Sequence, residues 1–160
     1  MANKKNISVR LGIGDLRRIK EVASRLDVKE SDIFRFAVKS LSTRLMPLIN
    51  RQLKGVPMLI ALLESGEDLL RYFEFDAYHL DRLINGEEDE RSVAEEDIEL
   101  LAIGIVNADY IADQLSGRLG TRIEAAGAFQ SLHDYLLHKY QGKPLRLAER
   151  AAPERPVVVA

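Results

Sequence analysis

The chain opens on a stretch, residues 4–11, in which polar and apolar side chains alternate. This period of two is typical of a β-strand with one buried face, and it predicts the one strand of the chain. A single strand leaves its backbone N–H and C=O groups unpaired, so we expect it to pair with the same strand of a second copy in an antiparallel ribbon. The face expected to enter a core consists of Ile7, Val9 and Leu11, and the polar face of Asn6, Ser8 and Arg10.

Two helical patterns follow the alternating stretch. Apolar residues recur at three- and four-residue spacing over residues 16–26 and again over residues 28–41. Asp27 separates the two patterns, and Asp is one of the few residues other than Gly that tolerate a left-handed turn. Pro47 cannot continue the second helix without a kink. The pattern therefore predicts a strand, a helix, a short turn and a second helix within residues 1–45.

This order of elements resembles the ribbon-helix-helix family of DNA-binding proteins, the class of Arc, the methionine repressor and the copy-number repressors. The resemblance covers residues 1–45 only. It implies that the paired strands lie in the major groove of DNA, with Asn6, Ser8 and Arg10 at the family's base-reading positions. The chemistry suits the task, because Arg can fork onto guanine, Asn can pair with adenine, and Ser can donate or accept.

The resemblance also implies that the start of the second helix holds a DNA phosphate. Free backbone N–H groups and the helix dipole favour an anion at such an end. Two features depart from the family pattern: Asp27 stands where Gly is usual, and Glu30 and Asp32 add negative charge beside the expected phosphate. The residues assigned to phosphate contact are Lys4, Lys5, Lys29, Glu30 and Ser31.

The charge of the chain is unevenly distributed. Residues 1–54 contain 13 Lys and Arg against 5 Asp and Glu, a balance of +8. Residues 55–160 contain 10 Lys and Arg against 20 Asp and Glu, a balance of −10. This asymmetry predicts a polyanionic partner, double-stranded DNA, for the first part alone.

Residues 46–150 are expected to form an acidic helical domain, followed by a tail at 151–160. Its first part, residues 46–63, is so apolar that we expect it to be the surface where domains or dimers meet. Three S/T-x-x-D/E patterns, which begin at Ser65, Ser92 and Thr121, predict helix starts. With stops at Asn85-Gly86, Gly120 and Gly142, they predict a bundle of helices near 66–84, 93–119 and 122–141.

No pattern in the acidic part indicates a catalytic or metal site. The acidic runs at 87–90 and 95–97 are typical of a solvated loop and a first helical turn. His79, His133 and His138 lack the spacing of metal ligands, and no catalytic motif is present, so we expect neither an enzyme, a metal nor a cofactor. Asn107, Asp109 and Asp113 either line the wet face of a helix or mark a ligand pocket or a polar subunit contact.

The absence of Cys favours a cytoplasmic location, and no stretch is long and apolar enough for a membrane partner. Together these patterns predict a mainly α protein with an N-terminal ribbon-helix-helix module and a C-terminal helical bundle. The expected function is a dimeric or tetrameric, sequence-specific transcriptional regulator, such as a repressor. One alternative is an antitoxin whose C-terminal part binds a partner protein, the toxin. The other is an assembly protein that uses the ribbon only to dimerise.

Overall fold

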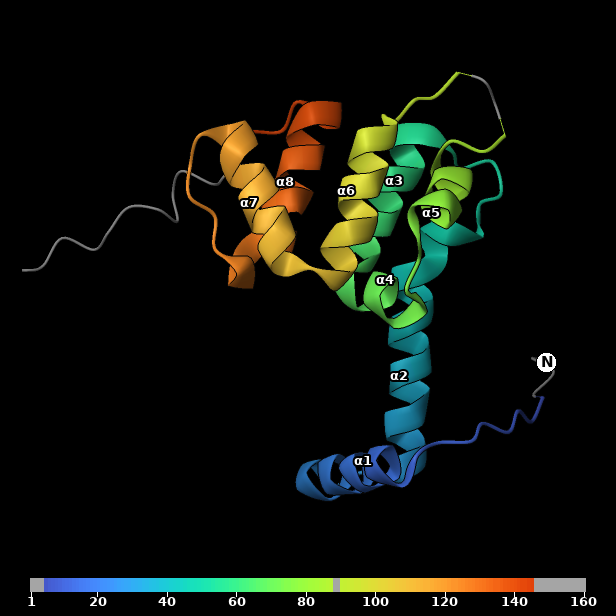
Figure 1. Cartoon of the computed structure of the whole chain (residues 1–160). Coiled ribbons are helices and arrows are strands. Elements are labelled where there is room, and N and C mark those ends of the chain that lie inside the picture. The colour runs from blue at the N-terminus through green and yellow to red at the C-terminus, as the bar shows by residue number, and fades with distance from the viewer. Residues whose placement is uncertain (1–4, 88–89, 146–160) are drawn as a thin grey trace, which may run out of the picture. The chain divides into compact units, whose positions relative to one another are not determined.

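The computed structural model describes residues 5–87 and 90–145 (Figure 1). These residues form eight α-helices and two 3₁₀-helices, and none of them lies in a β-strand. The chain divides into two compact units between Met46 and Pro47. Lys4, the acidic residues Glu88 and Asp89, and the predicted tail at 151–160 lie outside the described residues.

The first unit contains α1 (Ile13–Leu26) and α2 (Glu30–Leu45), which pack against each other. Helix α1 ends because Asp27 adopts the left-handed conformation, with φ 53° and ψ 46°. The backbone N–H of Val28 then donates to the carbonyl of Ala23 at 3.0 Å, which satisfies a carbonyl at the helix end. The two helices and the turn at Asp27 are therefore confirmed.

The predicted strand at residues 4–11 is wrong. Residues 5–12 have no regular secondary structure and lead from the N-terminus to α1 as the dark-blue trace in Figure 1. Ile7 and Val9, expected in a core, are 85% and 73% exposed. Alternating polar and apolar residues give a segment one apolar face that could be buried. A β-strand forms only where a second strand pairs with its backbone, and the described chain contains no such strand. The fold is thus all-helical over the described residues, without the ribbon.

The second unit is a helical bundle organised around α6, which packs against α4, α5, α7 and α8. None of the helices in the described ranges is long and apolar enough to cross a membrane. After the short 3₁₀-helix η1 (Met46–Ile49), the elements are α3 (Gly55–Ser65), α4 (Glu67–Phe73), α5 (Ala77–Ile84), α6 (Glu95–Val106), α7 (Ala108–Leu119), the 3₁₀-helix η2 (Ala125–Gly127) and α8 (Ala128–Gln141).

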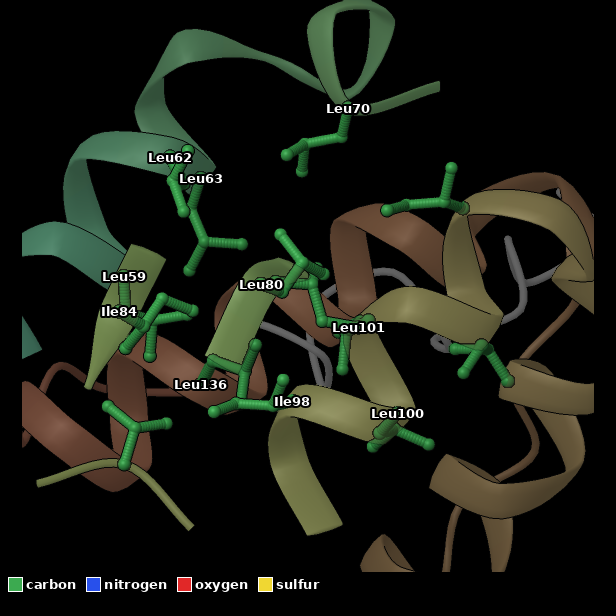
Figure 2. Packing of buried hydrophobic residues seen from close by; sticks show 14 of the residues in the cluster. Leu59, Leu62, Leu63, Leu70, Leu80, Ile84, Ile98, Leu100, Leu101 and Leu136 are labelled. Carbon is green, nitrogen blue, oxygen red and sulfur yellow. The ribbon is translucent and has the colours of Figure 1, made fainter. Parts of the chain in front are cut away.

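Leucine and isoleucine side chains from most of these helices form one core, shown in Figure 2. Leu59 and Leu62 of α3 are 1% and 2% exposed and belong to it. The prediction that residues 46–63 form a contact surface between domains or dimers is therefore wrong for the part within α3. Its apolar side chains are covered by α5 and α8 of the same unit.

Two of the predicted long helices are each divided in two. The first breaks between Phe73 and Ala77, and the second at Asn107. The new helix starts carry the side-chain caps: Asp76 accepts from the backbone N–H of His79 at 2.7 Å, and Asn107 accepts from that of Tyr110 at 3.0 Å. Both are Asp or Asn, the residue types that best satisfy a free backbone donor at a helix start.

The three predicted capping patterns do not act as caps. Ser65 is the last residue of α3, and its hydroxyl donates to the carbonyl of Ala61 at 2.7 Å. Helices α6 and α8 begin three and seven residues after Ser92 and Thr121, and their N-cap residues make no side-chain cap bond. The predicted helix ends are confirmed at Asn85, Gly120 and Gly142.

Candidate nucleic-acid interface

The three residues assigned to base contact lie on the segment ahead of α1. Asn6, Ser8 and Arg10 are all exposed, as is Lys5. Lys4, assigned to phosphate with Lys5, lies outside the described residues. The side chains available here are therefore an amide, a hydroxyl, a guanidinium and an ammonium, which are all groups that hydrogen-bond to base edges or phosphates.

The start of α2 carries the other predicted phosphate contacts. Lys29 occupies the N-cap position in an extended conformation and makes no side-chain hydrogen bond to the first turn. Glu30 and Ser31 are exposed. The carboxylate of Asp32 lies 3.0 Å from the guanidinium of Arg35, so an ion pair offsets one of the two acidic charges at this helix end.

An open hollow of about 750 Å³ brings part of this predicted set together. Lys5 and Asn6, from the segment ahead of α1, line it together with Ser31 at the start of α2. Ser8, Arg10, Lys29 and Glu30 are not among its lining residues, so the structure gathers only part of the set. The hollow is lined by Lys5, Asn6, Ile7, Ser31, Phe34, Arg35, Val38 and Lys39.

The first unit has almost no core within one chain. Ala23 is its one buried residue among residues 5–46. The apolar patterns that predicted α1 and α2 remain largely exposed, with Leu26 at 60%, Val38 at 65% and Leu41 at 46%. Exposed apolar faces of this extent are typical of an interface, because a unit this small cannot bury enough apolar surface alone.

The polar candidates of the second unit form no metal cluster among the described residues. No group of three or more His, Asp or Glu side chains in the described ranges could hold a metal ion. Asn107, Asp109 and Asp113 are exposed in one chain, which agrees with a wet helix face and argues against a buried ligand pocket. A polar contact with a second chain stays a prediction.

The second unit has a hollow of its own, of about 530 Å³. A volume of this size lies in the range of small-molecule sites. Small side chains form much of its wall, and charged side chains lie among them. The lining residues are Leu63, Glu64, Gly66, Glu67, Arg71, Gly104, Ala108, Ala125, Ala126, Phe129, Gln130 and His133.

A buried carboxylate in α6 was not anticipated from the sequence. Asp97 was expected in a solvated first turn, yet its side chain is 0% exposed. One carboxylate oxygen, Oδ2, accepts from Lys139 and from the Tyr140 hydroxyl, each at 2.6 Å. The Tyr140 hydroxyl in turn accepts from the backbone N–H of Ala94 at 2.9 Å. These bonds hold α8 against the start of α6.

Helix α7 joins the same network through Arg118. Its guanidinium lies 3.6 Å from Oδ1 of Asp97, an oxygen without a hydrogen-bond partner, and donates to the Tyr135 hydroxyl at 3.3 Å. That hydrogen bond is the main reason why the pKa of Arg118 is raised. We interpret the network as structural, because it ties α6, α7 and α8 together and none of its residues lines the hollow of the second unit.

The network predicts how stability depends on alkaline pH. The hydrogen bond to Asp97 raises the pKa of Lys139, and burial raises that of Tyr140. A group whose pKa is raised by folding makes its full contribution to stability at any pH below its pKa in the unfolded chain, which is about 10 here. That contribution is lost as the pH rises through the pKa of the group in the folded protein. We therefore expect the free energy of unfolding to fall above about pH 10.

Urea unfolding at pH 8.5 and at higher pH measures this dependence. The Tyr140→Phe, Lys139→Met double variant should show a shallower fall than the parent, because both titrating groups are gone. An equally steep fall in the double variant would show that other groups cause it.

Comparison of the chain with known protein families, curated proteins and solved structures finds no match.

Proposed function

We propose that the protein is a homodimeric, sequence-specific DNA-binding regulator. Its first unit would dimerise through the uncovered apolar faces of α1 and α2, and would hold duplex DNA with the segment ahead of α1 and the start of α2. One observation carries the proposal: a unit with 10 Lys and Arg against 5 Asp and Glu over residues 5–46 has almost no core of its own. It needs a partner for its apolar faces and an anion for its charge.

A second copy is the most economical cover for the apolar faces. Burying one Leu or Val side chain contributes about 1.5–3 kcal/mol. Two-fold symmetry doubles every such contribution, because the same patch is used by both chains. Leu41 lies on α2 and Leu26 lies at the end of α1, so a dimer could bury both side chains twice over.

Double-stranded DNA is the anion that suits the polar groups. Arg10 can bind guanine, Asn6 can bind adenine, and the positive balance of the unit supplies the attraction to phosphate that dominates affinity. Helix α2 has 16 residues, and no side chain caps its first turn, so its first backbone N–H groups are further donors for a phosphate.

The second unit would join dimers into tetramers or bind an effector or a protein partner. Its α4–α5 corner exposes Tyr72, Phe73 and Tyr78 at 83%, 57% and 71%, which is a surface suited to a protein contact. Its continuous core argues against the antitoxin alternative, because toxin-binding segments that fold only on binding lack such a core.

Two substitutions separate base contact from phosphate contact. Arg10→Ala should cost about 1–3 kcal/mol on the preferred DNA sequence and blur base choice there. Lys5→Ala should weaken binding to all sequences alike and reduce the dependence of affinity on salt. Selection of binding sites from a random duplex library, followed by titrations at several salt concentrations, measures both.

Failure to bind any duplex at low salt would contradict the proposed function. It would favour the assembly-protein alternative, in which the first unit serves only to dimerise. Equal losses on all sequences for Arg10→Ala would remove that residue from base contact.

A further inference from the structure

The lining of the hollow in the first unit includes two basic residues that lie beyond the first turn of α2. Arg35 and Lys39 follow Ser31 at intervals of four residues, so the three lie along one face of the helix. All three residues line the hollow, together with Lys5 and Asn6. From Ser31 to Lys39 the helix rises about 12 Å, which is longer than the spacing of successive phosphates along a DNA strand.

The charged residues that line the hollow are all basic, and we call them its rim. They are Lys5, Arg35 and Lys39, and none of the eight lining residues is acidic. Arg35 pairs with Asp32, but both side chains are largely exposed, at 78% and 49%, and such a pair contributes little. A guanidinium has five donors, so Arg35 can keep this contact and still donate to a phosphate.

The apolar residues that line the hollow would suit a different occupant. Ile7, Phe34 and Val38 are apolar and could contact a second copy of the chain. A second copy would leave three like charges unpaired around its edge, and this is unfavourable unless acidic groups meet them. The rim is therefore matched in charge to a polyanion.

We infer that the phosphate backbone of DNA runs along the rim formed by Lys5, Arg35 and Lys39. The DNA contact would then extend two helical turns along α2, beyond the helix start assigned from the sequence. This inference rests on the proposed function, since it extends the same interface. It assigns Arg35 and Lys39 to affinity and salt dependence, with no part in base choice.

The test compares charge-neutralising variants inside and outside the hollow. The Arg35→Gln, Lys39→Gln double variant removes two rim cations, and Arg17→Gln, Lys20→Gln removes two exposed cations of α1 that do not line the hollow. Affinity for a random-sequence duplex of about 30 base pairs, some three helical turns, is measured at several salt concentrations. Lys39→Gln alone serves as a second rim variant, because Lys39 takes no part in the Asp32 pair.

The rim variant should bind about 10- to 100-fold more weakly at low salt, and its plot of log affinity against log salt should be shallower by at least about 1. The α1 variant should keep the slope of the parent protein. The rank order of preferred sequences should stay unchanged in both. Sedimentation should show the same oligomeric state for all the variants.

Two results would overturn the inference while the proposed function stands. One is an unchanged slope in the rim variants when the parent binds DNA. The other is dissociation of the rim variants into monomers with an unchanged slope, which would assign the rim to contact with a second copy. A parent protein that binds no duplex at all would contradict the proposed function itself.

Discussion

Replacing Leu41 with Asp is expected to dissociate the protein into monomers. In one chain this side chain is 46% exposed on α2, where a charge would change stability by only about 0.5 kcal/mol. In the proposed dimer it lies in the shared core, and two copies are lost together. The loss should reach at least about 3 kcal/mol per dimer, which weakens association by more than about 100-fold.

The matched control is Ser40→Asp, which adds the same charge one position earlier on the same helix. Ser40 is polar and exposed, so this variant should remain dimeric. Sedimentation equilibrium over a range of protein concentrations gives both association constants. If Leu41→Asp associates as strongly as the parent, the apolar face of α2 is not the dimer contact.

Replacing Asp97 with Ala should destabilise the second unit by about 2–3 kcal/mol. The substitution removes a fully buried carboxylate and, with it, the acceptor for Lys139 and for the Tyr140 hydroxyl. Hydrogen bonds to a charged group contribute about 1.5–3 kcal/mol. The loss is limited because Lys139 is 39% exposed and can be hydrated once its partner is gone.

Glu96→Ala is the control, because Glu96 is the exposed neighbour of Asp97 in the same first turn. It should change the free energy of unfolding by no more than about 0.5 kcal/mol. Urea unfolding followed by circular dichroism compares the two variants. Equal stability of Asp97→Ala and Glu96→Ala would mean that the network does not hold α6, α7 and α8 together.

Spacing alone predicted the helices of the first unit but not the state of the segment before them. The helical patterns at residues 16–26 and 28–41 need no distant partner, because a helix forms its backbone hydrogen bonds within its own segment. Asp27 forms the turn between them, which is also local. The alternation at residues 4–11 could specify only which face would be buried. Strand formation depends on a partner that lies outside this stretch, so local sequence could not establish it.

In the second unit, the sequence predicts three long helices because the S/T-x-x-D/E patterns resemble helix starts, although none of the three acts as a cap. Ser65 has the right spacing to Asp68 for a capping box, but its hydroxyl bonds backward to Ala61 within α3. Asp76 and Asn107 are the side-chain caps that the structure shows. The apolar residues on both sides of Asn107 favour one long helix, so the pattern does not reveal Asn107 as a cap.

Sequence patterns do not predict the buried Asp97 network, since its partners in α8 lie more than 40 residues away. One local signal was present. Asp97 precedes Leu101 and Ile105 at four-residue intervals, and both are buried, so the carboxylate falls on the core face of α6. A charged residue on such a face indicates a buried partner, whereas the acidic run around it suggested solvent.

Sedimentation velocity of the full chain with a labelled random-sequence duplex at low salt shows whether the protein is a dimer that binds duplex DNA. We expect the free protein to have twice the mass of one chain. We also expect a faster-sedimenting complex that contains two chains or a multiple of two, and that dissociates as salt is raised. A protein that sediments as a single chain and leaves the duplex unshifted would rule out both the proposed dimer and its DNA binding.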